Sequence, residues 1–152
     1  MSAIIPLTYR VFFLYIEPIV TIAVACYAAL KPSGYLGAVA SSIQHTVIHT
    51  NQTKVVLEQL GNVYLFMALN EYFVLSSTRS TTTWKRLLLA LLIADCGHLV
   101  SMRGLGVQVY WNIWEWNVFT AASVLLVYFY ITLRICFLFD VGMGESRKVK
   151  AL

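Results

Sequence analysis

The stretch LLLALLIADCGHLVSM, residues 87–102, places an acid and an imidazole inside a long apolar run. Eight apolar residues lead directly into Asp95, and His98 follows three positions later. Residues three apart lie on one face of a helix, so these two side chains are neighbours. An ionisable group at the middle of a bilayer costs about 2.5–3.5 kcal/mol and usually faces a protein interior. The stretch therefore predicts a membrane helix whose polar face meets other helices.

The composition of the whole chain also indicates a membrane protein. Of its 152 residues, 59% are hydrophobic and 12% are charged, whereas soluble domains carry about 25% charged residues. Three cysteines in three different apolar segments argue against a disulfide framework. The net charge of +4 comes without a basic face carrying aromatic side chains, which argues against a nucleic-acid partner. We expect a single membrane domain over residues 1–152.

Four segments are long enough to cross about 30 Å of hydrocarbon, which takes about 20 helical residues. They cover residues 11–30, 55–75, 84–102 and 116–139. Tryptophan and tyrosine stand at several of their ends, as is typical of membrane–water interfaces. The loop 31–54 could hold a short amphipathic or re-entrant piece. The predicted fold class is all-α, a polytopic membrane protein with four transmembrane helices in a bundle.

The basic residues predict the orientation of the bundle, because cytoplasmic loops are enriched in lysine and arginine. Three of them fall on one side, at Lys31, Lys54 and Arg103, and eight on the other, at Arg10, Arg79, Lys85, Arg86, Arg134, Arg147, Lys148 and Lys150. Both termini are therefore expected in the cytoplasm, and a glycosylation sequon at residues 51–53 in the opposite loop agrees with this. The C-terminal KVKAL is similar to the dilysine retrieval signal of endoplasmic-reticulum membrane proteins, so we expect the protein in that membrane.

Polar side chains on other predicted helices lie at a depth similar to that of Asp95. At about 1.5 Å per residue, Glu17 falls near the middle of the first helix. One cavity could therefore collect Glu17, Asp95 and His98 with an amide from Asn62 or Asn70. Structural alternatives exist, because Glu17 precedes a proline that can kink the helix, and Asp95 could pair with His98 for packing alone.

Glu71 and Arg134 lie deeper toward the cytoplasmic side and could form a separate ion pair. That pair could be structural or catalytic, and Arg134 could instead extend its charge to the interface. His45 and His49 are four residues apart, but no carboxylate completes a metal-binding pattern with them. We expect neither a metal nor another cofactor.

The available groups are carboxylates, an imidazole, amides and aromatic rings, and the chain has no phosphate-binding loop, Cys-x-x-Cys or serine elbow. Burial favours the neutral form of a carboxylic acid, which can then protonate an ether or epoxide oxygen. A second carboxylate, kept ionised by His98 or Arg134, can act as a base. This set fits hydrolysis or cyclisation of an epoxide in a lipophilic substrate, and equally proton-driven isomerisation of an alkene.

Much of the chain resembles a family of small fungal four-helix membrane proteins from secondary-metabolite gene clusters. The resemblance is carried by YRVFFLYIEP (9–18), ALNE (68–71), LLIADCGH (91–98) and WNVFTAASVLLVYFYITLRICFLF (116–139). The chain is similar to the hydrolases of citreoviridin-, aurovertin- and asteltoxin-type polyketide pathways. The resemblance implies opening of polyene epoxides made by a flavin monooxygenase of the same pathway. It also implies working roles for Glu17, Glu71, Asp95 and His98.

The first hypothesis is therefore a membrane-bound epoxide hydrolase or epoxide-opening cyclase that acts on a polyene polyketide without a cofactor. Asp95 would protonate the epoxide oxygen with His98 tuning it, and Glu17 or Glu71 would activate the nucleophile. Further polar and aromatic side chains are expected to bind the substrate: Asn62, Tyr64, Asn70, Trp111, Asn112, Trp114, Glu115 and Arg134.

Three other functions could use the same residues. A meroterpenoid cyclase would apply the acid to an epoxyfarnesyl chain and stabilise carbocations on aromatic faces, although such cyclases usually have more helices. A sterol-isomerase-like enzyme would shuttle a proton between glutamate and histidine. A non-catalytic carrier or scaffold would serve a neighbouring monooxygenase. The four helices could enclose the cavity alone, or a homodimer could complete it.

Overall fold

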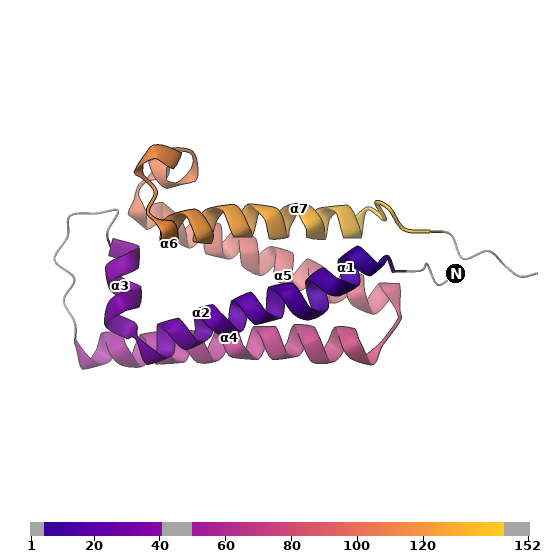
Figure 1. Ribbon diagram of the computed structural model, residues 1–152, viewed down its shortest axis with the longest axis horizontal. Coiled ribbons are helices and arrows are strands. Elements are labelled where there is room, and N and C mark those ends of the chain that lie inside the picture. Colours follow the sequence, from indigo (N-terminus) through magenta and orange to yellow (C-terminus); the bar gives the residue numbers. More distant parts are fainter. Residues whose placement is uncertain (1–4, 41–49, 145–152) are drawn as a thin grey trace, which may run out of the picture.

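In the computed structural model, the long helices form two antiparallel pairs (Figure 1). The structure describes residues 5–40 and 50–144, and no strand occurs in these ranges. A continuous first helix, made of α1 (Leu7–Val11), η1 (Phe12–Ile16) and α2 (Glu17–Leu30), packs along α4 (Asn51–Ser77). The second pair joins α5 (Thr81–Met102) to a continuous last helix made of α6 (Val118–Ala121), η5 (Ala122–Leu126) and α7 (Val127–Leu138).

The helices begin at polar capping residues that lie outside the apolar runs. The Thr50 and Ser80 side chains accept hydrogen bonds from the backbone of α4 and α5 at 3.2 and 3.3 Å. Asn117 accepts one from Thr120 N at 2.7 Å before α6. Side chains of this kind satisfy backbone N–H groups that have no partner inside the helix. The observed helices at α4 and α5 therefore start three or four residues before the predicted segments.

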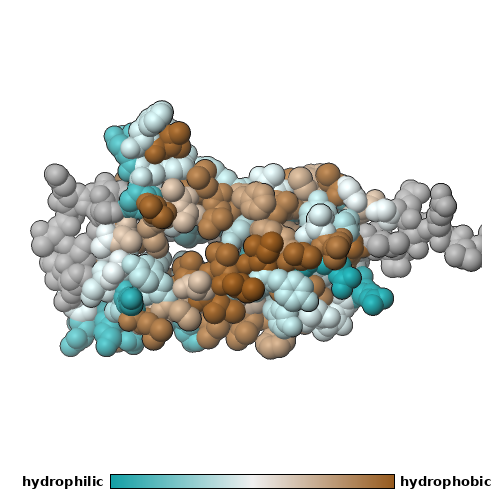
Figure 2. Space-filling model, viewed as in Figure 1, coloured by the Kyte–Doolittle hydropathy of each residue, from teal (hydrophilic) through white to brown (hydrophobic). Residues whose placement is uncertain are grey.

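Within the described residues, three helices are long and apolar enough to cross a membrane: 7–30, 81–105 and 118–138. This fits an integral membrane protein. The predicted fourth span, α4, has 27 residues, but it is less apolar than these three helices. Polar residues such as Asn62, Asn70 and Glu71 interrupt it. In each of the helices 81–105 and 118–138, only 17% of the most apolar stretch is buried inside the protein. Figure 2 shows apolar side chains along the outside of the bundle.

The two ends of the bundle are built differently. At one end α3 (Pro32–Ala40) runs across the long helices (Figure 1). The short turns η2 (Arg103–Leu105), η3 (Val107–Tyr110) and η4 (Ile113–Glu115) lie at the same end. A hydrogen bond of 2.9 Å from Asn117 Nδ2 to Ala38 O ties α3 to the last helix. The loop 31–54 thus holds a helix, although residues 41–49, with His45 and His49, lie outside the described ranges, as does KVKAL. At the other end lie α1, the α4–α5 connection and the end of α7.

The two pairs meet most tightly near α1, around an aromatic core. Phe13, Trp84 and Phe137 are almost fully buried there. Leu14 and Leu91 belong to the same core, and Glu17 and Asp95 follow them by about one turn, on the side toward α3. Toward α3 the pairs diverge, and Figure 2 shows a hollow between α2 and α7. The ionisable groups therefore lie where the packed half of the bundle opens.

Close approach of α2 to α4 depends on a single glycine. A Cβ at Gly61 would lie 2.8 Å from Ala25 O and 2.9 Å from Ala29 Cβ. Because the first of these is a backbone atom, it could not turn aside as a flexible side chain could. Small residues allow helix backbones to approach in this way in membranes. The contact fixes the position of α4, and with it Glu71, relative to α2.

Candidate functional site

Arg134 on α7 joins the two helix pairs through two ion pairs. One terminal nitrogen of its guanidinium pairs with Glu17 Oε1 on α2 and the other with Asp95 Oδ2 on α5. The arginine is 2% exposed and Glu17 3% exposed. A planar guanidinium can serve two carboxylates at once because its donors point in fixed, separate directions. Three helices are thereby held together at one buried point.

The expected ion pair between Glu71 and Arg134 is wrong. Among the described residues, the partners that Arg134 pairs with are Glu17 and Asp95. The depth of Arg134 was estimated from its position along the helix, but side chains lean toward the N-terminus of their helix. On α7 this direction leads back toward the level of Asp95. The long arginine side chain thus reaches mid-depth, where Arg134 belongs to the ionisable centre.

Glu71 on α4 completes the group as a carboxyl with no cation of its own. It is 3% exposed and lies within electrostatic reach of Glu17, Asp95 and Arg134, with Glu17 the strongest carboxylate neighbour. Its side chain shares a hydrogen bond with that of Glu17. We call Glu17, Glu71, Asp95 and Arg134 the acid cluster. It brings three carboxyl groups around one guanidinium, in unequal environments.

His98 lies at the edge of the acid cluster. It is half-buried one turn from Asp95, interacts with that carboxylate, and is hydrogen-bonded to the backbone at Ser123 in η5. Its Nε2 has no hydrogen-bond partner in the described part of the chain. The imidazole can therefore support Asp95 but does not take part in the ion pairs.

Sequence reasoning missed Tyr130, which lies against the acid cluster. Its ring centre is 5.8 Å from Arg134 Cζ, an arrangement in which a cation is attracted to an aromatic face. The side chain is 8% exposed. A tyrosine in an apolar run is usually a packing residue. The available signal was its spacing of four from Arg134, which places the two residues on one helix face.

Two of the helices that supply the cluster contain π-helical turns close to it. η1 ends immediately before Glu17, and Pro18 follows. Proline has no N–H to donate, so the preceding turn cannot keep regular α-helical hydrogen bonding. η5 occupies residues 122–126 of the last helix, where the His98 side chain contacts the backbone. Single π turns inside helices are frequent at functional sites.

Within the described residues, the amides expected in the cavity, and Tyr64 expected to bind the substrate, form no hydrogen bond with the acid cluster. Asn62 is exposed, because nine residues separate it from Glu71 and two and a half turns place it on the opposite face of α4. Asn70 Nδ2 donates to Phe66 O in its own helix at 3.0 Å. Tyr64 interacts with Tyr35 of α3 instead. The prediction that Asn62 shares a cavity with Asp95 is wrong, whereas for the half-buried Asn70 it stays a prediction.

The aromatic and polar residues of 111–115 lie apart from the acid cluster. Asn112 and Glu115 line a pocket of about 160 Å³ together with Leu105, Gln108, Val109, Trp116 and Thr120. Thr120 precedes Arg134 by fourteen residues on one continuous helix, which is roughly 21 Å. Trp111 and Trp114 are 64% and 90% exposed, as suits residues anchored at a membrane interface. The predicted substrate contacts therefore fall into two separate places.

The comparisons with known proteins give a family but no activity. A family model described as "Domain of unknown function (DUF7704)" matches residues 2–144, and the chain belongs to that family. No curated protein and no solved structure matches the chain. What the acid cluster does must follow from its own chemistry.

Proposed function

We propose that this member of the DUF7704 family is a membrane-bound enzyme that opens an epoxide in a lipophilic substrate, as an epoxide hydrolase or an epoxide-opening cyclase. The observation that carries the proposal is the convergence of three carboxyl groups and one guanidinium from four helices at a buried point. Buried ion pairs gain little stability over apolar packing. Carboxyl groups in unequal environments, however, are how proteins separate an acid from a base.

We infer which carboxyl groups are ionised from the charges beside them. Arg134 stabilises the ionised forms of Glu17 and Asp95 through charged hydrogen bonds. Glu71 has no such cation, and a second uncompensated negative charge would be costly at this buried position. Glu71 is therefore the group that holds a proton. The acid role, expected from the sequence at Asp95, passes to Glu71 in this proposal.

The reaction balances with these groups alone. The proton of Glu71 moves to the epoxide oxygen as the C–O bond of the ring breaks. The Glu17 carboxylate takes a proton from water, or from a hydroxyl of the substrate, as that oxygen bonds to the epoxide carbon. Since Glu17 and Glu71 are neighbours, the proton then passes from Glu17 to Glu71 and restores the starting state. Attack by water gives a diol, and attack by an internal hydroxyl gives a cyclic ether.

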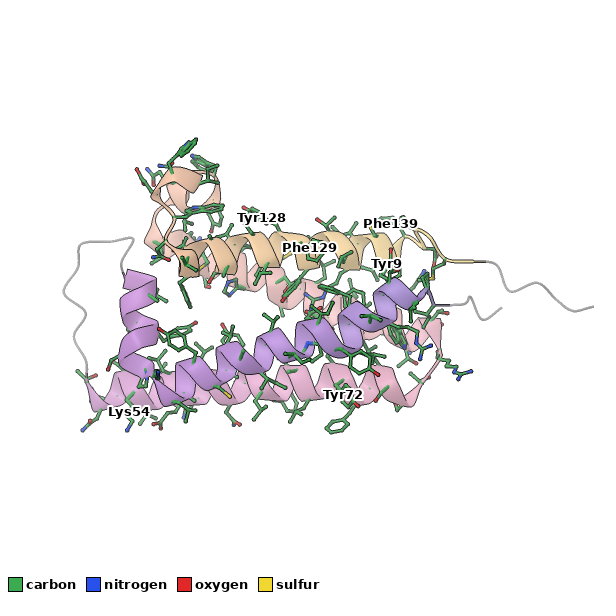
Figure 3. The ribbon with its side chains drawn as sticks, viewed as in Figure 1. Tyr9, Lys54, Tyr72, Tyr128, Phe129 and Phe139 are labelled. Atoms are coloured by element: carbon green, nitrogen blue, oxygen red, sulfur yellow. The ribbon has the colours of Figure 1, made fainter. Side chains whose placement is uncertain are left out.

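A lipophilic substrate suits the surroundings of the acid cluster. Phe129 lies on the side of α7 that faces the first helix, where its ring is 5.3 Å from that of Phe12 in η1 (Figure 3). It is 49% exposed. An apolar chain could thus reach the cluster from the bilayer. The resemblance to polyketide-cluster hydrolases points to a polyene epoxide formed by a flavin monooxygenase of the same pathway.

The proposal includes four spans, both termini in the cytoplasm and an endoplasmic-reticulum location. The arrangement in Figure 1 supports it, because α1 and the end of α7 lie at the same end of the bundle. We expect an impermeant maleimide to label Thr8→Cys, but not Gln108→Cys, on sealed microsomes. The free thiols of Cys26, Cys96 and Cys136 are first replaced by serine. Labelling at Gln108→Cys alone would contradict this orientation.

Turnover by the purified protein tests the activity. In liposomes, the wild type should consume the epoxide of a conjugated polyene with saturation kinetics, as followed by chromatography, and protein-free liposomes should not. An epoxyfarnesyl compound is compared in parallel, and a preference for it would favour the meroterpenoid alternative. If the protein consumes neither epoxide, the proposed activity is wrong.

A further inference from the structure

Buried polar atoms without a partner gather at the acid cluster. Two such atoms of the described residues, Tyr130 Oη and Arg134 Nε, lie there beside the Glu17 carboxylate. An unpaired polar group away from water costs about 1–3 kcal/mol, so native proteins rarely leave one without a protein or water partner. Two on one face of α7, with the ionised Glu17 beside them, indicate a partner that they share.

The chemistry of these groups defines that partner. The Glu17 carboxylate accepts hydrogen bonds, Arg134 Nε–H donates, and the Tyr130 hydroxyl can do either. A cation would be opposed by the guanidinium and an anion by the carboxylates. A water molecule offers two donors and two acceptors, and buried waters typically make about three hydrogen bonds to such groups. The set therefore fits a water molecule or the hydroxyl of a substrate.

The position of Tyr130 is fixed by contacts that do not use its hydroxyl. Its ring lies by Arg134 at 5.8 Å and by the Phe12 ring at 5.6 Å. A change to phenylalanine keeps both ring contacts and removes one oxygen. Tyr128, two residues earlier, supplies a matched control, because its hydroxyl lies 3.4 Å from Tyr110 O on the outer part of the bundle.

We propose that Tyr130 Oη, the Glu17 carboxylate and Arg134 Nε hold the attacking water of the epoxide-opening reaction, which makes Tyr130 a further catalytic residue. The role of this water in the reaction rests on the proposed function. The water site itself rests on the unpaired atoms alone. When an internal hydroxyl attacks, its oxygen takes the same position. Glu17 accepts the proton from this oxygen, and Tyr130 keeps it directed at the epoxide carbon.

Kinetics give the first test. Tyr130→Phe should lower kcat for epoxide opening about 10- to 100-fold, the effect of one lost hydrogen bond to a charged reacting group. KM should be unchanged, because the apolar contacts of the substrate remain. Tyr128→Phe should behave as the wild type. A Tyr130→Phe enzyme with wild-type kcat would overturn the catalytic role of Tyr130 and leave the proposed function standing.

Water-edited solid-state NMR gives a second test that needs no activity. In liposomes, magnetisation from water should reach the carboxyl carbon of Glu17, identified by its absence in the Glu17→Gln variant. This transfer should be lost in Tyr130→Phe and kept in Tyr128→Phe. An unchanged transfer in Tyr130→Phe would refute the water site. A lost transfer in a protein that opens no epoxide would support the site and reject the proposed function.

Discussion

Arg134→Leu should destabilise the folded protein by about 3–5 kcal/mol, the usual effect of removing one partner from a buried ion pair. Glu17 and Asp95 both pair with Arg134, so the leucine variant leaves two buried carboxyl groups without their cation. Leucine can fill much of the space of the arginine stem, and the loss should therefore be electrostatic. Denaturant unfolding in detergent micelles measures it.

Neutralising the carboxyl groups separates this charge effect from a packing effect. The triple variant Glu17→Gln, Asp95→Asn, Arg134→Leu should recover most of the lost stability, because no uncompensated charge remains buried. Arg10→Leu, an exposed arginine, serves as the control and should unfold as the wild type does. A single Arg134→Leu variant as stable as the wild type would show that the ion pairs do not hold the bundle together.

Glu71→Gln should lower kcat for epoxide opening by about 10²- to 10⁴-fold, the range that general acid–base catalysis contributes. Glutamine has nearly the shape of the acid and cannot donate an acidic proton. Because Glu71 forms no ion pair among the described residues, the change should leave the fold intact. Steady-state kinetics in liposomes measure kcat, and denaturant unfolding in micelles measures the stability.

Glu58→Gln is the matched control on the same helix. Glu58 is exposed, and its carboxylate lies 3.7 Å from Lys54 Nζ, an exposed pair of the kind that contributes little. This variant should keep the wild-type kcat. If Glu71→Gln turns over as fast as Glu58→Gln, the acid must be another residue, with Asp95 the next to test.

The position of a residue along its predicted helix correctly indicated that Glu17 and Asp95 lie at one depth. The direction in which each side chain leaves its helix was not considered. The depth of Glu17 and Asp95 placed them at one level, and the structure has them on one guanidinium. Asn62 has a suitable depth too, yet it is half a revolution away from Glu71 and is exposed. Depth gives the position of a side chain along the helix axis but not its direction around that axis. The residues expected in the cavity were chosen by depth alone.

Other features could not be obtained from local patterns. The reach of Arg134 depends on the direction of a long side chain and on where neighbouring acids lie, neither of which is visible in the spacing of residues. Tyr130 gains its importance from three other helices. The helix α3 follows a single turn residue at Lys31 and begins with proline, a favourable first helical residue, but its nine residues are too short for a clear apolar period.

The isotope content of the product tests the central claim most directly. Wild-type protein in liposomes is given a polyene epoxide in ¹⁸O-enriched water, beside Glu71→Gln and Glu58→Gln. We predict that the wild type and Glu58→Gln convert it to a diol carrying one ¹⁸O or to an unlabelled cyclic ether, and that Glu71→Gln forms about 1% of this product or less in the same time. Intact epoxide in every sample, or equal product from all three proteins, would contradict the assignment of the acid cluster as an epoxide-opening centre.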